Sequence, residues 1–391
     1  MSLLDSAKKP QLDALTGCRF IAASLVVWYH YFPHALQTVA PFRAVISRGY
    51  MAVSFFFVLS GFVLAYNYSG SEFDSQKRVR FWIARFCRIY PTYLLALVLA
   101  APFHLYAMFA GLLEFSLKKW LAGGILSALC LQAWLPQTAQ SWNGPGWSIS
   151  CEAFFYAVFP LLIARLHRQS LSRLLRTCTL LWIIGLIPPA ALWTTGHLGL
   201  HSGWQAWESS TSVEELFVLT FPLFHLPAFV AGMAAGSLFV KHGPLSPGTS
   251  LASVLAATTV TVLVCSSPLP RESLWNGILA PVFALLIYAL TTKSPWTALL
   301  TRRSMQLLGD ASYAQYILQY PVFLLLSLKL QVLGLTEDRT PLTKFACVFA
   351  SLVAASITTS AGASRLGRRL SRKLAILLPA AKPAMPDPVE V

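Results

Sequence analysis

Apolar segments of about twenty residues recur along the whole chain, and this pattern limits the folds that are open to it. Of the 391 residues, 56% are hydrophobic and only 12% carry a charge. A soluble protein rarely combines so few charges with so much apolar surface, and an α-helix needs roughly twenty apolar residues to cross a bilayer. The sequence therefore predicts an all-α polytopic membrane protein.

Short basic clusters separate the apolar segments and set the expected topology. Clusters of Lys and Arg mark cytoplasmic loops, and ten spans with both termini in the cytoplasm satisfy that rule. The expected spans are 12–32, 50–67, 86–109, 148–164, 177–195, 216–240, 250–267, 274–291, 305–332 and 342–362. The chain then divides into a cytoplasmic tail (1–11), a membrane domain (12–362) and a second cytoplasmic tail (363–391), basic at first and then rich in proline.

The segment 117–136 is apolar but is not counted among the spans. Gly123 and Gly124 interrupt it, and Pro136 ends it. If it crossed the bilayer, the arginines that follow span 148–164 would lie on the outer side, against the positive-inside rule. We therefore predict a re-entrant or interfacial segment on the outer side of the membrane.

The net charge of +15 and the seven cysteines point to no further class of site. The basic residues follow the membrane topology and form no single patch, so a nucleic acid partner is not expected. The cysteines are scattered, and no CxxC or mixed Cys/His spacing is present. The sequence therefore supports neither a metal site nor a disulfide framework.

The first predicted span carries two ionisable residues, Arg19 and His30. Eleven residues separate them, so at about 100° per residue they return to the same helical face, about 16 Å apart along the axis. Ionisable side chains at membrane depth are costly and by default mark a functional interior. The alternative is that each extends to a membrane interface.

Arg85 and Arg88 lie at the expected cytoplasmic end of the third span, before Pro91. A spacing of three places both guanidiniums on one helical face. Two adjacent guanidiniums suit a ligand that carries phosphate. The alternative is an ordinary positive-inside anchor.

A second polar group opens the fourth span, where Trp147 is followed by alternating Ser148, Ser150 and Glu152. We interpret these residues as the polar wall of a site. Glu152 also has a structural interpretation, because a helix dipole favours an acid in the first turn.

Two more polar motifs can be interpreted structurally, the first as helix packing and the second as a helix cap. Ser60 and Gly61 follow a phenylalanine run in the second span, and small residues allow helices to approach closely. Asp310 and Ser312, with Tyr313 next to them, fit the N-cap region of the ninth span.

Taken together and in order, five motifs resemble the integral-membrane acyltransferase-3 family. They are LTGxRFxAA with the following His, FFFVLSGF, RxxRIYP, WSISxE and GDxSYxxY, and the resemblance covers roughly residues 12–362. It implies that His30 is the essential histidine and that Arg85 and Arg88 bind acyl-CoA. We expect Arg19, on the same helix as His30, to contact acyl-CoA as well, along the path between these arginines and His30. Gln319 stands where the family usually has a histidine.

The resemblance also implies an activity. Family members transfer acyl groups, usually acetyl, from cytoplasmic acyl-CoA to hydroxyls of cell-surface glycans, lipid-linked sugars, peptidoglycan or antibiotics. We therefore expect a multi-pass O-acyltransferase of the bacterial inner membrane, with acyl-CoA as its donor substrate and no bound cofactor. The expected acceptor is a glycan or a lipid-linked sugar.

In the expected reaction, His30 is the general base or an acyl relay, a role that suits an imidazole with an ordinary pKa of about 6.5. Glu152, with Ser148 and Ser150, orients the sugar or His30. Three alternatives stay open: acylation of a small-molecule hydroxyl, a glycolipid transporter without chemistry, and a membrane sensor or scaffold with a degenerate site.

Overall fold

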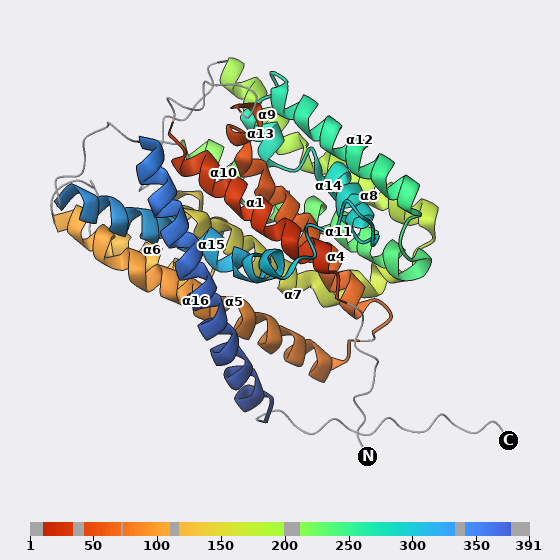
Figure 1. Cartoon of the computed structure of the whole chain (residues 1–391), viewed down its shortest axis with the longest axis horizontal. Coiled ribbons are helices and arrows are strands. Elements are labelled where there is room, and N and C mark those ends of the chain that lie inside the picture. The colour runs from red at the N-terminus through yellow and green to blue at the C-terminus, as the bar shows by residue number, and fades with distance from the viewer. Residues whose placement is uncertain are drawn as a thin grey trace.

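The computed structural model describes residues 11–33, 43–71, 73–109, 117–198, 212–332 and 341–376. Over these ranges the chain forms α-helices and short 3-10 turns, with no β-strand. The helices pack into one bundle (Figure 1). The prediction of an all-α fold is confirmed.

The helices follow the predicted order, and several predicted spans consist of two helices. The long helices are α1 (Asp13–Tyr31), α4 (Ala52–Tyr68), α5 (Ser75–Phe109), α7 (Trp147–His167), α8 (Leu171–Gly185), α11 (Pro222–His242), α12 (Pro247–Ser266), α15 (Arg303–Val332) and α16 (Pro341–Ile376). The shorter ones are α3 (Arg43–Ile46), α6 (Leu117–Ala128), α9 (Ile187–His197), α10 (Val213–Thr220), α13 (Arg271–Trp275) and α14 (Ala280–Leu290).

Within the described part of the chain, eight helical segments are long and apolar enough to cross a membrane. They are 49–68, 75–106, 144–166, 171–196, 213–242, 247–266, 273–290 and 341–374. The two remaining predicted spans are also helical, α1 and α15, but they are not among these eight. These two helices carry Arg19, His30 and Asp310. The membrane character is confirmed, and the number ten and the side of the termini stay predictions.

The helix α4 lies in the interior of the bundle. Of its span, 78% is buried inside the protein, against 17% of the span of α12 at the edge. A Cβ atom on Gly61 would overlap the carbonyl oxygen of Phe229, and one on Gly232 of α11 would overlap that of Val58. The predicted role of small residues in close helix packing is confirmed here.

The helices α1 and α15 pack against each other with equally little room. A side chain on Gly309 would overlap the carbonyl oxygen of Thr16. Gln315, which is buried, donates from Nε2 to Ser24 Oγ at 3.1 Å. This contact brings together the helices that carry Arg19 and Asp310.

The segment 117–136 begins with α6, which has 12 residues. Such a helix is about 18 Å long, short of the hydrocarbon thickness of roughly 30 Å. Three 3-10 turns follow before α7, and side chains of the protein bond to part of their backbone. Gln132 Nε2 donates to the Gly146 carbonyl at 2.7 Å and Thr138 Oγ1 to the Gln132 carbonyl at 2.9 Å. These features fit the predicted re-entrant or interfacial segment.

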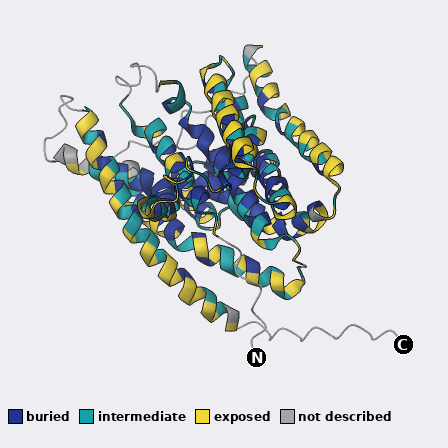
Figure 2. Cartoon of the chain, turned by 45° about the vertical axis from the view of Figure 1, so that its right-hand side comes forward, coloured by how far each residue is buried: buried dark blue, intermediate teal, exposed yellow. Residues whose placement is uncertain are grey.

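The helices α5 and α16 are longer than predicted. Helix α5 starts at Ser75 and passes through Pro91, so Arg85 and Arg88 lie within a continuous helix and not at its start. Helix α16 continues past residue 362 to Ile376 and includes the basic residues assigned to the tail. Figure 1 shows the end of α16 projecting from the bundle, and Figure 2 shows that this end is largely exposed.

The Pro91 position is also where α16 crosses α5. Proline has no N–H, so the carbonyl four residues earlier, that of Cys87, loses its helical partner. Gly367 of α16 lies against this same carbonyl, and a side chain there would overlap it. A proline that packs in this way need not end a helix, which explains why the sequence alone placed the start of the span too late.

Candidate active site

A cavity of about 530 Å³ opens between α1, α4, α5, α7, α15 and α16. Nine of the twelve predicted site residues line it: Arg19, Ser60, Arg85, Arg88, Ser148, Glu152, Asp310, Ser312 and Tyr313. His30, Trp147 and Ser150 do not. Five separated motifs of the sequence thus meet in one site.

The two ends of the cavity differ in chemistry. Along α4 the lining runs from Phe56 through Ser60, and along α7 from Ser148 through Glu152. The two rows are in register, because Ser60 Oγ donates to Glu152 Oε1 at 3.2 Å. At one end the Phe56 ring lies 6.2 Å from that of Tyr316, whose hydroxyl bonds to Ser148 Oγ at 2.9 Å. We call this the aromatic end.

The opposite part of the cavity, the arginine end, contains Arg19, Arg85 and Arg88. Arg19 and Arg85 are half-buried and Arg88 is exposed. None of the three has a carboxylate within 4 Å among the described residues, and the buried Nε of Arg85 has no hydrogen-bond partner there. Guanidiniums left without a partner in a cavity suit a phosphate-bearing ligand.

Glu152 is held in place on the arginine side of the aromatic end. Its Oε1 accepts hydrogen bonds from Ser60 and from the Tyr156 hydroxyl one turn further along α7. Tyr156 is itself buried, and its carbonyl accepts from Trp82 Nε1 at 3.0 Å. The sequence interpretation missed Tyr156, although its i+4 spacing from Glu152 on an expected helix is a usable signal.

Ser150 does not belong to the polar wall that its alternation with Ser148 and Glu152 suggested. The helix α7 begins at Trp147, so Ser148 and Glu152 share a face and Ser150 faces away from it. Ser150 Oγ instead donates to the Cys130 carbonyl at 2.6 Å. Trp147 is buried against Trp275, with 5.9 Å between the rings.

Asp310 and Ser312 are not N-cap residues, because α15 already begins at Arg303. Both line the cavity from within the helix, and Ser312 Oγ donates to the Gly309 carbonyl at 2.6 Å. The Tyr313 hydroxyl bonds to the Ile89 carbonyl of α5 at 3.0 Å, which ties α15 to the helix that carries Arg85 and Arg88. Gln319, fully buried, lies outside the lining and donates to the Tyr316 carbonyl.

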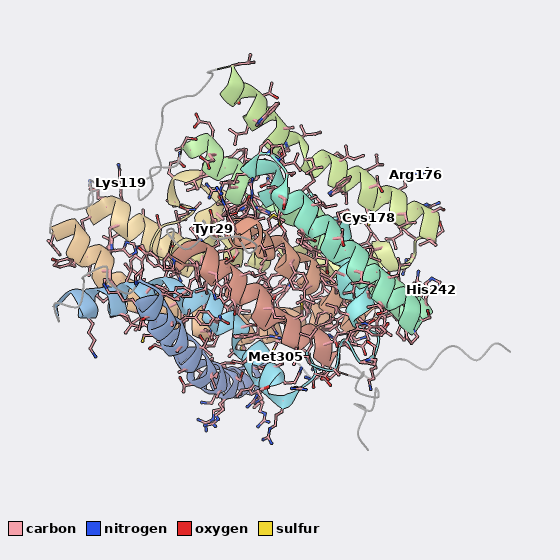
Figure 3. All side chains as sticks on the ribbon, turned by 45° about the horizontal axis from the view of Figure 1, so that its top comes forward. Tyr29, Lys119, Arg176, Cys178, His242 and Met305 are labelled. Carbon is pink, nitrogen blue, oxygen red and sulfur yellow. The ribbon has the colours of Figure 1, made fainter. Side chains whose placement is uncertain are left out.

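His30 lies in the last turn of α1, outside the cavity and exposed. In Figure 3, Tyr29, the residue before His30, lies well apart from Met305 at the start of α15. His30 Nδ1 lies 2.8 Å from the Val26 carbonyl oxygen. Only a protonated Nδ1 can donate this bond, so Nε2 is the nitrogen with a free lone pair.

The aromatic end of the cavity approaches the surroundings of His30. Val53 lines the cavity, and Tyr50 precedes it by three residues, a rise of about 4.5 Å along the chain. The Tyr50 ring lies 5.1 Å from that of Tyr29, which in turn lies 4.8 Å from the His30 ring. The arginines and Glu152 therefore line the cavity, whereas His30 lies outside it, beyond the aromatic end.

The family model described as the acyltransferase domain (Acyl_transf_3) matches residues 12–361. The chain belongs to the acyltransferase-3 family. It is thus an acyltransferase enzyme with membrane helices. No solved structure matches the chain significantly.

Two curated proteins are similar to the chain. Acyltransferase MdmB of Streptomyces mycarofaciens is 29% identical over 335 residues, which is 80% of this chain and 79% of that protein. Protein 2 in picA locus of Rhizobium radiobacter is 38% identical over 99 residues, 25% of this chain and 48% of that protein. The first of these names agrees with the family assignment.

Within the described ranges no group of three or more His, Cys, Asp or Glu side chains is arranged to hold a metal ion. All seven cysteines are free.

Proposed function

We propose that the protein is an O-acyltransferase of the bacterial inner membrane that moves an acyl group, acetyl by family habit, from cytoplasmic acyl-CoA to a hydroxyl of a cell-surface glycan or lipid-linked sugar. One observation carries this proposal. A single cavity has guanidiniums without a carboxylate partner among the described residues at one end, and an aromatic end that approaches a histidine whose Nδ1 is bonded and whose Nε2 can accept a proton.

The donor lies in the cavity. Its phosphates meet Arg85 and Arg88, whose fork geometry suits phosphate oxygens. The flexible pantetheine arm runs past Glu152 toward Phe56 and Tyr316 and carries the thioester inward. The Glu152 carboxylate, fixed by Ser60 and Tyr156, accepts hydrogen bonds from the amide N–H groups of this arm. In this arrangement Glu152 serves the donor and does not orient His30.

His30 acts on the acceptor. Its Nε2 takes the proton of the acceptor hydroxyl while the hydroxyl oxygen attacks the thioester carbonyl carbon. The carbon–sulfur bond then breaks, the new ester is released, and the thiolate of coenzyme A takes the proton back from the imidazolium. In a relay version, Nε2 itself attacks the thioester carbonyl carbon and the coenzyme A thiolate leaves. The acceptor oxygen then attacks the acyl-imidazole, the carbon–nitrogen bond breaks, and the hydroxyl proton goes to the thiolate.

The test uses membranes that contain the protein, radiolabelled acetyl-CoA and a total bacterial extract of glycans and lipids, with His30→Ala membranes of equal protein content as control. The expected result is base-labile label in a glycan or lipid fraction with the wild type only. If well-expressed wild type labels no fraction, acetyl transfer to these acceptors is refuted and a transport role becomes the better account.

A further inference from the structure

The end of α16 continues from the cavity wall into a basic segment. Ser360, Ala361 and Ser364 line the cavity. The next turns of the same helix carry Arg365, Arg368, Arg369, Arg372 and Lys373, all exposed. The basic residues therefore begin where the cavity lining ends, and both belong to the same continuous helix.

Helix geometry divides these basic residues between two faces. At about 100° per residue, Arg368 lies within roughly 40° of Ser364 around the axis, and Arg372 lies within roughly 80°. Arg369 and Lys373 lie roughly 140° and 180° away from Ser364. The cavity-lining face thus continues as Arg368 and Arg372, while Arg369 and Lys373 are on the far face.

The contact with α5 fixes the direction of this face. Gly367 lies against the Cys87 carbonyl of α5, with no room for a side chain between them. Cys87 is next to Arg88, which is exposed and lines the cavity. The backbone of α16 is therefore fixed against α5 at this point, and Arg368, the exposed residue after Gly367, begins its side chain close to the arginine end of the cavity.

We propose that Arg368 and Arg372 form a second phosphate-binding site at the arginine end of the cavity, which receives the nucleotide phosphates of the acyl-CoA donor. This inference rests on the proposed function. Coenzyme A carries a diphosphate and a 3′-phosphate at its nucleotide end, more negative charge than Arg85 and Arg88 neutralise. The helix face that follows the cavity lining supplies the complementary charge.

Membrane topology gives a competing reason for basic residues at this place, since such clusters meet anionic lipid headgroups. That explanation does not distinguish one helix face from the other. The two faces therefore provide a matched pair of variants, R368Q/R372Q and R369Q/K373Q. Each removes two positive charges from exposed positions of the same two turns.

The experiment measures equilibrium binding of radiolabelled coenzyme A to the full chain in a neutral detergent without anionic lipid. We expect R368Q/R372Q to weaken binding about tenfold, as two exposed charge contacts would, and the loss to shrink at high salt. We expect R369Q/K373Q to change it less than twofold. Binding of acetyl-pantetheine, which lacks the nucleotide, should be equal in both variants and the wild type.

Equal effects of the two variants would overturn the inference, as would a difference that arises only when anionic lipid is added. If the wild type binds no coenzyme A, the donor assignment under the proposed function fails instead. If the wild type binds and R368Q/R372Q binds equally well, only the second phosphate site fails. Thermal unfolding of each variant shows whether a loss reflects misfolding.

Discussion

The aromatic end of the cavity should limit the length of the acyl group, and Phe56 is the residue that tests this. Phe56 is half-buried, lines the cavity and lies 6.2 Å from the Tyr316 ring. In Phe56→Ala the six ring carbons are removed from the wall that faces the incoming thioester. We expect this variant to accept butyryl-CoA much better than the wild type does.

The magnitude follows from the two methylenes by which butyryl exceeds acetyl. Burying each contributes about 0.8 kcal/mol. If the wild type excludes both and the variant buries both, the preference changes by about 1.6 kcal/mol, roughly fifteenfold. The quantity to measure is the ratio of kcat/KM for butyryl-CoA to that for acetyl-CoA, because a general loss of folded protein cancels in this ratio.

Phe55→Ala is the matched control. Phe55 is the preceding residue of α4, but it is buried against Phe283 with 5.8 Å between the rings and does not line the cavity. The Phe55→Ala variant should have a lower free energy of unfolding, while its ratio of kcat/KM for butyryl-CoA to that for acetyl-CoA stays unchanged. A ratio that stays within twofold in Phe56→Ala, or that shifts equally in Phe55→Ala, would refute the reasoning.

Three further predictions concern residues whose roles the structure separates. Tyr156→Phe removes one of the two hydroxyl donors to Glu152 and leaves Ser60. We expect acyl transfer to fall about tenfold, because the loss of one hydrogen bond costs about 1.5 kcal/mol; unchanged transfer would contradict the role given to Glu152. Ser150→Ala should keep full transfer activity and lose about 1 kcal/mol of stability, measured by thermal unfolding in detergent; a large loss of activity at equal folding would return Ser150 to the site. Gly61→Leu should give little monodisperse protein in size-exclusion chromatography, because its side chain would overlap the α11 backbone; a well-folded variant would contradict the close α4–α11 packing.

Much of this arrangement was predictable from the sequence, because membrane helices are apolar and their exceptions are informative. Arg19, Arg85, Arg88 and Glu152 stand out against their surroundings, and all four line one cavity. The helical fold follows from the length and spacing of the apolar segments. The sequence also distinguished the segment 117–136 from the membrane spans, because its two glycines and the charges of the later loop argue against a crossing.

Other features depend on packing and were out of reach. The alternating sequence pattern suggested that Ser150 and Ser148 share one polar wall. Two residues apart in the helix α7, they point in nearly opposite directions. The sequence interpretation made Asp310 part of the N-cap region of a span expected to begin at residue 305, whereas α15 begins at Arg303 and Asp310 lies inside the helix. It assigned Glu152 to orienting the sugar or His30, and the register of α4 against α7 places Glu152 beside Ser60 on the arginine side.

The most direct test asks whether the donor cavity and His30 are separate parts of one reaction. Coenzyme A binding and acetyl transfer are measured on the same purified preparations of wild type, His30→Ala and R85Q/R88Q. The account predicts that His30→Ala binds coenzyme A within twofold of wild type and loses transfer by about 10²–10⁴-fold, and that R85Q/R88Q loses binding. Transfer retained in His30→Ala, or coenzyme A binding lost in His30→Ala and kept in R85Q/R88Q, would contradict it.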